Sequence, residues 1–180
     1  MAYIGSSPAN KPLTSSDITD GIIVTADIAD AQITSAKLAS GVGGKILQVV
    51  QATTTTEVAS TTATYIDAGL SQSITPSSTS NKIMIFCSYV LREDDSGGNA
   101  ITSIFRGATD LAVNDYGLGR LRSSATDNYV RQTITLLDEP SASTEITYTL
   151  KLKGFTVTNQ RIHANSSKGS LVLMEIEGWL

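Results

Sequence analysis

Hydrophobic and small residues recur every five positions between Pro12 and Gly41. Cut into fives, this stretch reads PLTSS, DITDG, IIVTA, DIADA, QITSA and KLASG. The fifth position of each pentad is small, and the second is always aliphatic: Leu13, Ile18, Ile23, Ile28, Ile33 and Leu38. A period of five matches neither the 3.6-residue period of an α-helix nor the two-residue period of a strand. The pattern therefore predicts a specialised repeat.

Two architectures use such a repeat. One is a pentapeptide-type β-solenoid, but six pentads form too few coils to bury a continuous core. The other is a fibre in which three chains wind together, each offering one aliphatic side chain per step to a shared axis. We favour the fibre, because a lone chain of this length could not offset its ordering entropy. The expected shaft core is Ile18, Ile23, Ile28, Ile33 and Leu38.

A different pattern begins after the glycines at 43 and 44, which predict a boundary between residues 1–44 and 45–180. From residue 45 onward, short runs rich in β-branched residues alternate with polar turns. The predicted strands cover residues 45–51, 64–67, 71–75, 82–91, 100–106, 110–113, 129–137, 145–153 and 170–176. The alternation in 129–137 and 145–153, with turn residues at 138–141, predicts a hairpin. The second region is thus predicted to be all-β, a jelly-roll-like β-sandwich preceded by an extended N-terminal fibre segment.

Two of these strands are apolar on both faces. In residues 83–91 one face carries Ile83, Ile85, Cys87, Tyr89 and Leu91, while the other carries Met84, Phe86 and Val90. Residues 171–176 also carry apolar side chains on both faces, with Leu171 and Leu173 on one and Val172, Met174 and Ile176 on the other. A sandwich strand buries one face in its own core, so the second face requires another cover. We expect a neighbouring copy of the chain to provide it; the alternative is a long loop of the same chain.

Composition and charge exclude several classes of protein. Charged residues make up 17% of the chain and the formal net charge is −4, which gives no electrostatic footprint for nucleic acid. No apolar stretch approaches the roughly 20 residues of a membrane span, and the N-terminus lacks the pattern of a secretory signal. The single cysteine, Cys87, cannot form an intrachain disulfide and is expected to be a buried small hydrophobe.

Candidate chemistry is sparse. His163 is the one histidine, and no G-x-S-x-G elbow accompanies it. The acidic residues fall in predicted loops, where carboxylates are usually solvated. Residues 92–99 (REDDSGGN) combine oxygen ligands with glycines, but their spacing is not that of an EF-hand, which leaves a calcium loop or a plain polar loop. We expect no catalytic residue, no metal site, no cofactor and no enzyme activity.

The best candidate for adhesion is the long irregular segment of residues 114–128. It contains Tyr116, Arg120, Arg122 and Asn128. Tyrosine and arginine stack on sugars or proteins and hydrogen-bond to them, and binding residues concentrate on loops held by rigid scaffolds. The alternatives are an ordinary connecting loop and, for Arg120 and Arg122, contacts between subunits.

The sequence also resembles a known family at both ends. The opening MAYIGSSPANKP and the repeats from Ile23 to Ala39 are similar to N-terminal segments of fibre proteins from marine bacteriophages, particularly phages of cyanobacteria. The stretches GKILQVVQATTTT, SITPSSTSNKIMI and GSLVLMEIEGWL resemble the globular domains that accompany them.

This resemblance implies a homotrimeric structural protein of the virion, made in the cytoplasm of a bacterial host. The N-terminal residues would anchor on other virion proteins, and the repeats would form a shaft. The head would be a jelly roll of the tumour-necrosis-factor type. The expected role is a tail-associated fibre that attaches to a host surface glycan or protein. The alternatives are a decoration fibre on the capsid or neck, and a carbohydrate-cleaving spike.

Overall fold

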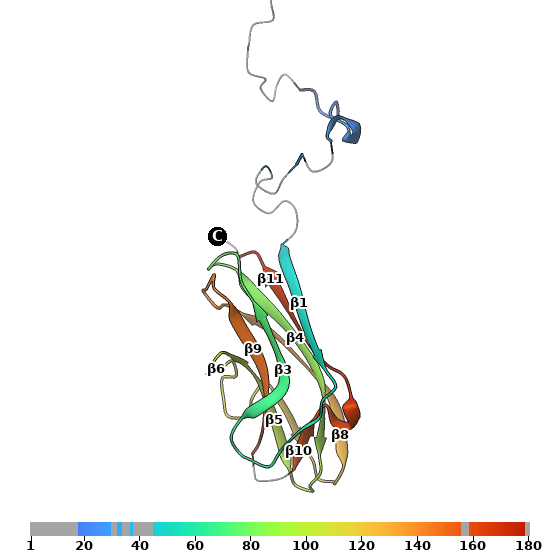
Figure 1. Cartoon of the computed structure of the whole chain (residues 1–180), viewed down its shortest axis with the longest axis vertical. Coiled ribbons are helices and arrows are strands. Elements are labelled where there is room, and N and C mark those ends of the chain that lie inside the picture. The colour runs from blue at the N-terminus through green and yellow to red at the C-terminus, as the bar shows by residue number, and fades with distance from the viewer. Residues whose placement is uncertain (1–17, 30–31, 34–36, 38–44, 156–158, 179–180) are drawn as a thin grey trace, which may run out of the picture. The chain divides into compact units, whose positions relative to one another are not determined.

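The computed structural model describes residues 18–29, 32–33, 37, 45–155 and 159–178 (Figure 1). The chain divides into two units, Met1–Gly44 and Lys45–Leu180. In the first unit the described residues are exposed and include one short 3-10 turn, η2 (Thr25–Asp27), where the Val24 N–H donates to Asp27 Oδ2 at 3.0 Å.

The predicted shaft-core residues have little cover in a single chain. Four of them are 39–53% exposed: Ile18, Ile23, Ile28 and Ile33. The fifth, Leu38, lies outside the described residues. The burial of these side chains against other copies stays a prediction.

The second unit is built from strands. Their bounds are β1 (Ile46–Thr54), β2 (Val58–Ser60), β3 (Ile66–Ile74), β4 (Lys82–Glu93), β5 (Asn99–Arg106), β6 (Thr109–Asp110), β7 (Gly119–Arg122), β8 (Asn128–Asp138), β9 (Ile146–Gly154), β10 (Gln160–Ile162) and β11 (Gly169–Ile176). A short 3-10 turn, η4 (Ala164–Ser166), separates β10 from β11. Six predicted strands match with shifted ends: 45–51, 82–91, 100–106, 129–137, 145–153 and 170–176. The predicted strands 64–67 and 71–75 overlap one strand, β3, and of 110–113 only residue 110 lies in a strand, β6. The short strands β2, β7 and β10 were not predicted.

The strands form two antiparallel sheets. In the first, β1, β11, β4 and β8 lie in that order. β10 pairs with the C-terminal end of β4, on the same side as β11, and β2 pairs with β10. In the second, β3, β9 and β5 lie in order, and β6 and β7 both pair with β5. Most chain connections cross from one sheet to the other, as in a jelly roll. The prediction of an all-β, jelly-roll-like sandwich is confirmed.

The alternation of side chains explains the core between the sheets. In β4 every second residue is fully buried: Ile83, Ile85, Cys87, Tyr89 and Leu91. From the facing sheet, Leu150 and Leu152 of β9 are also fully buried. The expectation for Cys87 is confirmed, and burial raises the pKa of its thiol to about 12.

The predicted hairpin is wrong. Residues 129–137 and 145–153 are strands, but β8 pairs with β4 while β9 pairs with β3 and β5 in the other sheet. Asp138, predicted to be a turn residue, is only 9% exposed. Its carboxylate accepts hydrogen bonds from Arg106 Nη1 at 2.8 Å and from the Tyr148 hydroxyl at 2.6 Å. The end of β8 is therefore tied to the facing sheet, because β5 and β9 supply both donors.

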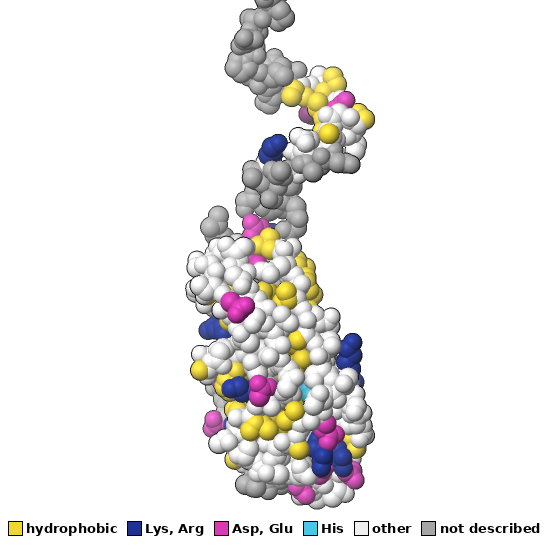
Figure 2. Space-filling model, viewed as in Figure 1, with side chains coloured by type: hydrophobic (Ala, Val, Ile, Leu, Met, Phe, Trp, Pro, Cys, Tyr) yellow, Lys and Arg dark blue, Asp and Glu magenta, His cyan; other side chains and the backbone are white. Residues whose placement is uncertain are grey.

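The outward face of the β1–β11–β4–β8 sheet is apolar along one full row and at the two central positions of the next row, which ends in Gln51 and Thr135. The strand register aligns four side chains in the first row: Val49, Met174, Met84 and Leu137. In the next row Val172 lies opposite Phe86. Val49 is 54% and Phe86 is 38% exposed, and Figure 2 shows hydrophobic side chains along the part of the head where Figure 1 places β1. We call these six residues the outer apolar face.

The surroundings of His163 predict that folding stability depends on pH. It is fully buried, its Nε2 lies 3.1 Å from the Ala68 carbonyl oxygen, and its ring packs directly against Gly169. Burial lowers the pKa of His163 below its ordinary value of 6.5, although the hydrogen bond to Ala68 opposes this shift. At pH values between the lowered pKa of the folded chain and 6.5, the unfolded chain binds a proton at His163 that the folded chain does not.

Folding stability should therefore fall as the pH is lowered from about 7 to about 5. Replacing His163 with asparagine, which tolerates its left-handed φ of 56°, should make this decline shallower. Urea unfolding at several pH values measures both slopes. A variant slope equal to that of the unmodified chain in this range would contradict the assignment to His163.

Candidate functional site

The predicted adhesion segment is not entirely irregular, because it contains the strand β7. In β7 the side chains alternate, so that Leu121 is buried while Arg120 and Arg122 are exposed. Leu121 lies opposite Ala100 of β5 and belongs to the core, which fixes the two arginines on the outward face. The sheet thus presents both guanidinium groups from one short strand.

The chain that leads into β7 lies close against β5. Gly117 has a φ of +65°, and its N–H donates to the Asn114 carbonyl at 3.3 Å, which closes a turn. A Cβ atom at this position would lie 2.4 Å from the Thr102 carbonyl oxygen. Glycine is therefore required by both the backbone conformation and the close approach. The side-chain oxygen of Asn114 also accepts from the Tyr116 N–H at 2.9 Å, which fixes the backbone beside the tyrosine ring.

An exposed aromatic pair stands at the centre of this surface. The Tyr116 and Phe155 rings are stacked, with centroids 5.7 Å apart and planes at 20°. The Arg120 guanidinium carbon lies 4.5 Å from the Tyr116 ring centroid, a cation–π geometry. Tyr116 is 47% and Phe155 49% exposed. Two large rings are thus held in place yet remain open to solvent.

Asn99 connects the members of this cluster. Its side-chain oxygen accepts from Arg120 Nε at 3.0 Å and from Arg120 Nη2 at 2.8 Å, while its carbonyl accepts from the Phe155 N–H at 3.0 Å. We call Tyr116, Phe155, Arg120 and Asn99 the aromatic cluster. Planar rings beside a fixed cation stack on sugar rings or on protein side chains at low entropic cost.

The structure brings together part of the predicted set. Tyr116 and Arg120 are in contact, and Arg122 projects two residues further along the same face of β7. Asn128 begins β8 in the other sheet, opposite Glu93. Phe155 was not predicted. Its signal in the sequence is an aromatic residue directly after a strand and before a mainly polar stretch, GFTVTNQR.

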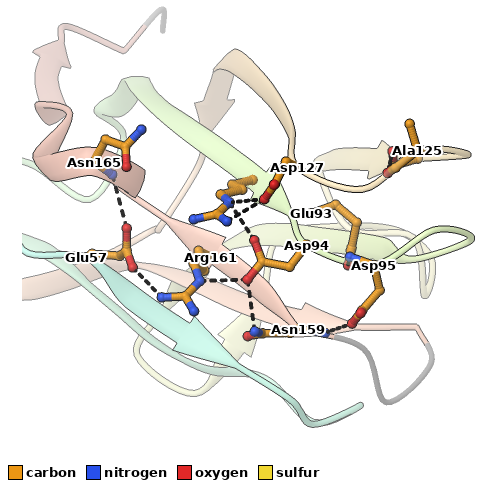
Figure 3. A network of polar contacts seen from close by, with 11 residues as sticks. Glu57, Glu93, Asp94, Asp95, Ala125, Asp127, Asn159, Arg161 and Asn165 are labelled. Atoms are coloured by element: carbon orange, nitrogen blue, oxygen red, sulfur yellow. Dashed lines mark hydrogen bonds and ion pairs between the residues drawn. The ribbon is translucent and has the colours of Figure 1, made fainter.

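A second polar cluster ties together several chain segments (Figure 3). Arg161 of β10 donates to Glu57 Oε1 at 2.6 Å and to Asp94 Oδ2 at 2.8 Å. Arg92 of β4 pairs with Asp94 at 2.5 Å and with Asp127. These residues include the acidic part of the suspected calcium loop. Of the loop carboxylates, Asp94 pairs with both arginines, and Glu57 and Asp127 outside the loop pair with one each, so the cluster is a structural cross-tie.

Other candidate chemistry is not assembled in the described part of the chain. His163 bonds to a backbone carbonyl and is sealed from solvent, which is unsuited to a Ser-His-Asp arrangement. No group of three or more His, Cys, Asp or Glu side chains among the described residues is placed to hold a metal ion. In the same residues, no helix has the length and apolar character to cross a membrane.

Comparison with known proteins gives a distant likeness in fold. No protein-family model matches the sequence, and no curated protein matches it. Among solved structures, the T13 viral particle of infectious bursal disease virus matches 70% of this chain at 12% identity and a TM-score of 0.44. The Gx strain of that virus matches 73% at 12% identity, and its VP2 subviral particle 74% at 9% identity, both with TM-scores of 0.35.

The matched region spans 31% of the first of these chains and 38% of the other two. This chain therefore corresponds to about a third of the length of those proteins. Likenesses at these TM-scores carry no inference about function.

Proposed function

We propose that the chain is a structural protein of a bacteriophage particle, a short trimeric fibre whose head contacts the host surface. The observation that carries the adhesive role is the aromatic cluster: Tyr116 and Phe155 are stacked, about half exposed, and held by Arg120 on a rigid sandwich. Solvent-exposed aromatic side chains that are fixed in place lose little entropy on binding. The ligand is a surface glycan or protein of the host, and no chemical step is involved.

The virion assignment draws on the order of parts along the chain. A pentad segment with a fibre-like period precedes a jelly-roll head, and both segments resemble fibre proteins of marine phages. The N-terminal residues would hold the fibre on other virion proteins.

Trimer formation is proposed through the outer apolar face and the pentad isoleucines. Both sets are uncovered in a single chain: Val49 is 54% exposed and Ile23 53%. Soluble monomers rarely expose contiguous apolar patches of large size. We propose that other copies of this chain cover both sets, because one homotypic assembly can bury the outer apolar face and the pentad isoleucines together.

Adsorption of the phage to its host tests the adhesive role. Purified full-length protein should compete with particles for host cells. The double variant Tyr116→Ala, Phe155→Ala should be at least about tenfold less potent, since loss of a central aromatic anchor commonly costs about 2 kcal/mol or more. Tyr129→Ala is the matched control, because Tyr129 is 43% exposed beside Arg92 but lies in the other sheet. Equal potency of the double variant and the unmodified protein would refute this role for the aromatic cluster.

The shaft proposal has its own test. Replacing Ile28 with aspartate would place three carboxylates together in an apolar channel, so residues 1–44 should become markedly more sensitive to protease. Asp20→Asn is the control, because Asp20 occupies the polar fourth position of its pentad and is exposed. Limited proteolysis of both variants beside the unmodified protein makes the comparison. Equal resistance of Ile28→Asp would mean that the isoleucines share no core, and would favour a segment that lies on another virion protein.

A further inference from the structure

A pocket next to the aromatic cluster has the composition of a site for an acidic sugar. It has a volume of about 440 Å³ and is lined by Ser96, Gly97, Arg122, Ser123 and Ser124. Its walls come from the turn between β4 and β5, from Arg122 at the end of β7 and from the segment that follows β7. We propose that this serine pocket binds the carboxylate of a uronic-acid-type sugar through Arg122, which rests on the proposed adhesive function and specifies its ligand.

The two arginines of β7 differ in what they contact. Arg120 is fully engaged, because it donates twice to Asn99 and lies over the Tyr116 ring. Arg122 is exposed, and its guanidinium forms no hydrogen bond or ion pair with another described residue. A guanidinium presents paired N–H donors that match a carboxylate in a bidentate fork. Arg122 therefore supplies a free anion-recognising group at the wall of the pocket.

The neighbouring carboxylates do not neutralise Arg122. Asp94 and Asp127 pair with Arg92, and Asp94 also accepts from Arg161. Asp95 accepts from the Asn159 N–H at 2.7 Å. Glu93 is fully buried, and its Oε1 accepts from the Asp95 N–H at 3.4 Å. None of these four carboxylates forms an ion pair with Arg122, which leaves its guanidinium available to a ligand.

The rest of the lining suits a polyhydroxylated ligand. Hydrogen bonds within the protein hold the pocket wall: Gly97 N–H donates to the Ser123 carbonyl at 2.8 Å, and Ser96 Oγ donates to the Ser124 carbonyl at 2.9 Å. The Ser123 hydroxyl is occupied, because it donates to the Ala125 carbonyl at 2.5 Å and accepts from the Ala125 N–H at 3.1 Å. The Ser96 and Ser124 hydroxyls can accept from sugar hydroxyls. Arg120 and Arg122 are two residues apart on one strand face, about 7 Å between Cα atoms, so a second sugar could reach the aromatic cluster.

Ligand-observed saturation-transfer NMR on the full-length protein tests this proposal, with glucuronate, glucose and acetate as probes. Glucuronate should bind at least tenfold more tightly than glucose, which lacks the carboxylate, and than acetate, which lacks the ring. Arg122→Ala should weaken glucuronate at least tenfold, with Arg122→Lys in between. Arg131→Ala should have no effect, because Arg131 is also an exposed arginine but lies on the other sheet.

The outcomes separate this proposal from the adhesive function. Equal binding of glucuronate by Arg122→Ala and by the unmodified protein would overturn the serine pocket as its site, and so would acetate binding as tight as that of glucuronate. If glucuronate binds through Arg122 but the protein does not compete for host cells, the serine pocket stands and the adhesive role fails.

Discussion

Replacing Glu175 with glutamine is expected to lower the free energy of unfolding by about 2–4 kcal/mol, because it disrupts a buried carboxylate with several donors. Glu175 on β11 is 1% exposed. Its Oε1 accepts from the Ser77 N–H at 2.6 Å, the Ser77 hydroxyl at 2.7 Å and Asn81 Nδ2 at 2.5 Å, and its Oε2 accepts from Gln48 Nε2 at 2.5 Å. A glutamine offers one acceptor oxygen, and its amide N–H groups would face donors.

The same carboxylate should make folding sensitive to acid. Burial raises the pKa of Glu175, but the hydrogen bonds from Gln48, Asn81 and Ser77 outweigh it, so the pKa is lowered from its ordinary value of 4.5. Its contribution to stability is therefore present above pH 4.5 and is lost as the pH falls below that value. In Glu175→Gln this part of the acid decline should be missing.

Urea unfolding at neutral pH and at about pH 3–4 measures both effects. The matched control is Glu139→Gln, because Glu139 has a 66% exposed side chain and forms only a surface ion pair with Lys82. Such pairs contribute about 0–1 kcal/mol. Comparable losses for the two variants at neutral pH would show that the Glu175 donors find other partners at little cost.

The second large effect concerns assembly: Phe86→Asp should convert the proposed trimer into separate chains. Phe86 lies near the middle of the outer apolar face, opposite Val172 and beside the row that contains Met84. In a three-fold assembly one substitution buries three carboxylates without partners, and each unpaired buried charge costs several kcal/mol. Multi-angle light scattering should give three times the 19.0 kDa chain mass for the unmodified protein and the single-chain mass for the variant.

Thr133→Asp is the control for this substitution. Thr133 is exposed on the same outward face, but it lies opposite Ser88 in a polar row. This variant should keep the mass of the unmodified protein. A stable single-chain mass for the unmodified protein would contradict the trimer, and a trimeric Phe86→Asp would place the interface elsewhere.

The sequence predicted strands better than it predicted their partners. Alternation is a local property, so the buried face of β4 was identified residue by residue, with Ile83 and Leu91 at its ends. Which strand lies beside which is not local. The residues between β8 and β9 look like a turn, yet the connection crosses between sheets, and Asp138 is buried against Arg106 and Tyr148. Turn composition specifies a reversal of the chain but not the sheet it enters.

In the candidate site, too, contacts within one segment could be predicted from the sequence, whereas contacts between distant segments could not. Tyr116 and Arg120 were predicted from one segment of unusual composition, and they are in contact. Phe155 was missed because its stacking on Tyr116 joins two loops about forty residues apart, which only the pairing of β9 with β5 brings together. The difference between Arg120 and Arg122 also depends on such a distant partner, Asn99.

We propose that this chain projects from a phage particle as a trimeric fibre with an adhesive head. Immunogold electron microscopy of intact particles, with antibody against the region Lys45–Leu180, tests it most directly. We expect gold on the outside of the particle at tail-associated positions, and loss of host adsorption when the antibody is bound. Gold on the capsid or neck would favour the decoration fibre, and particles that carry no gold would contradict the account.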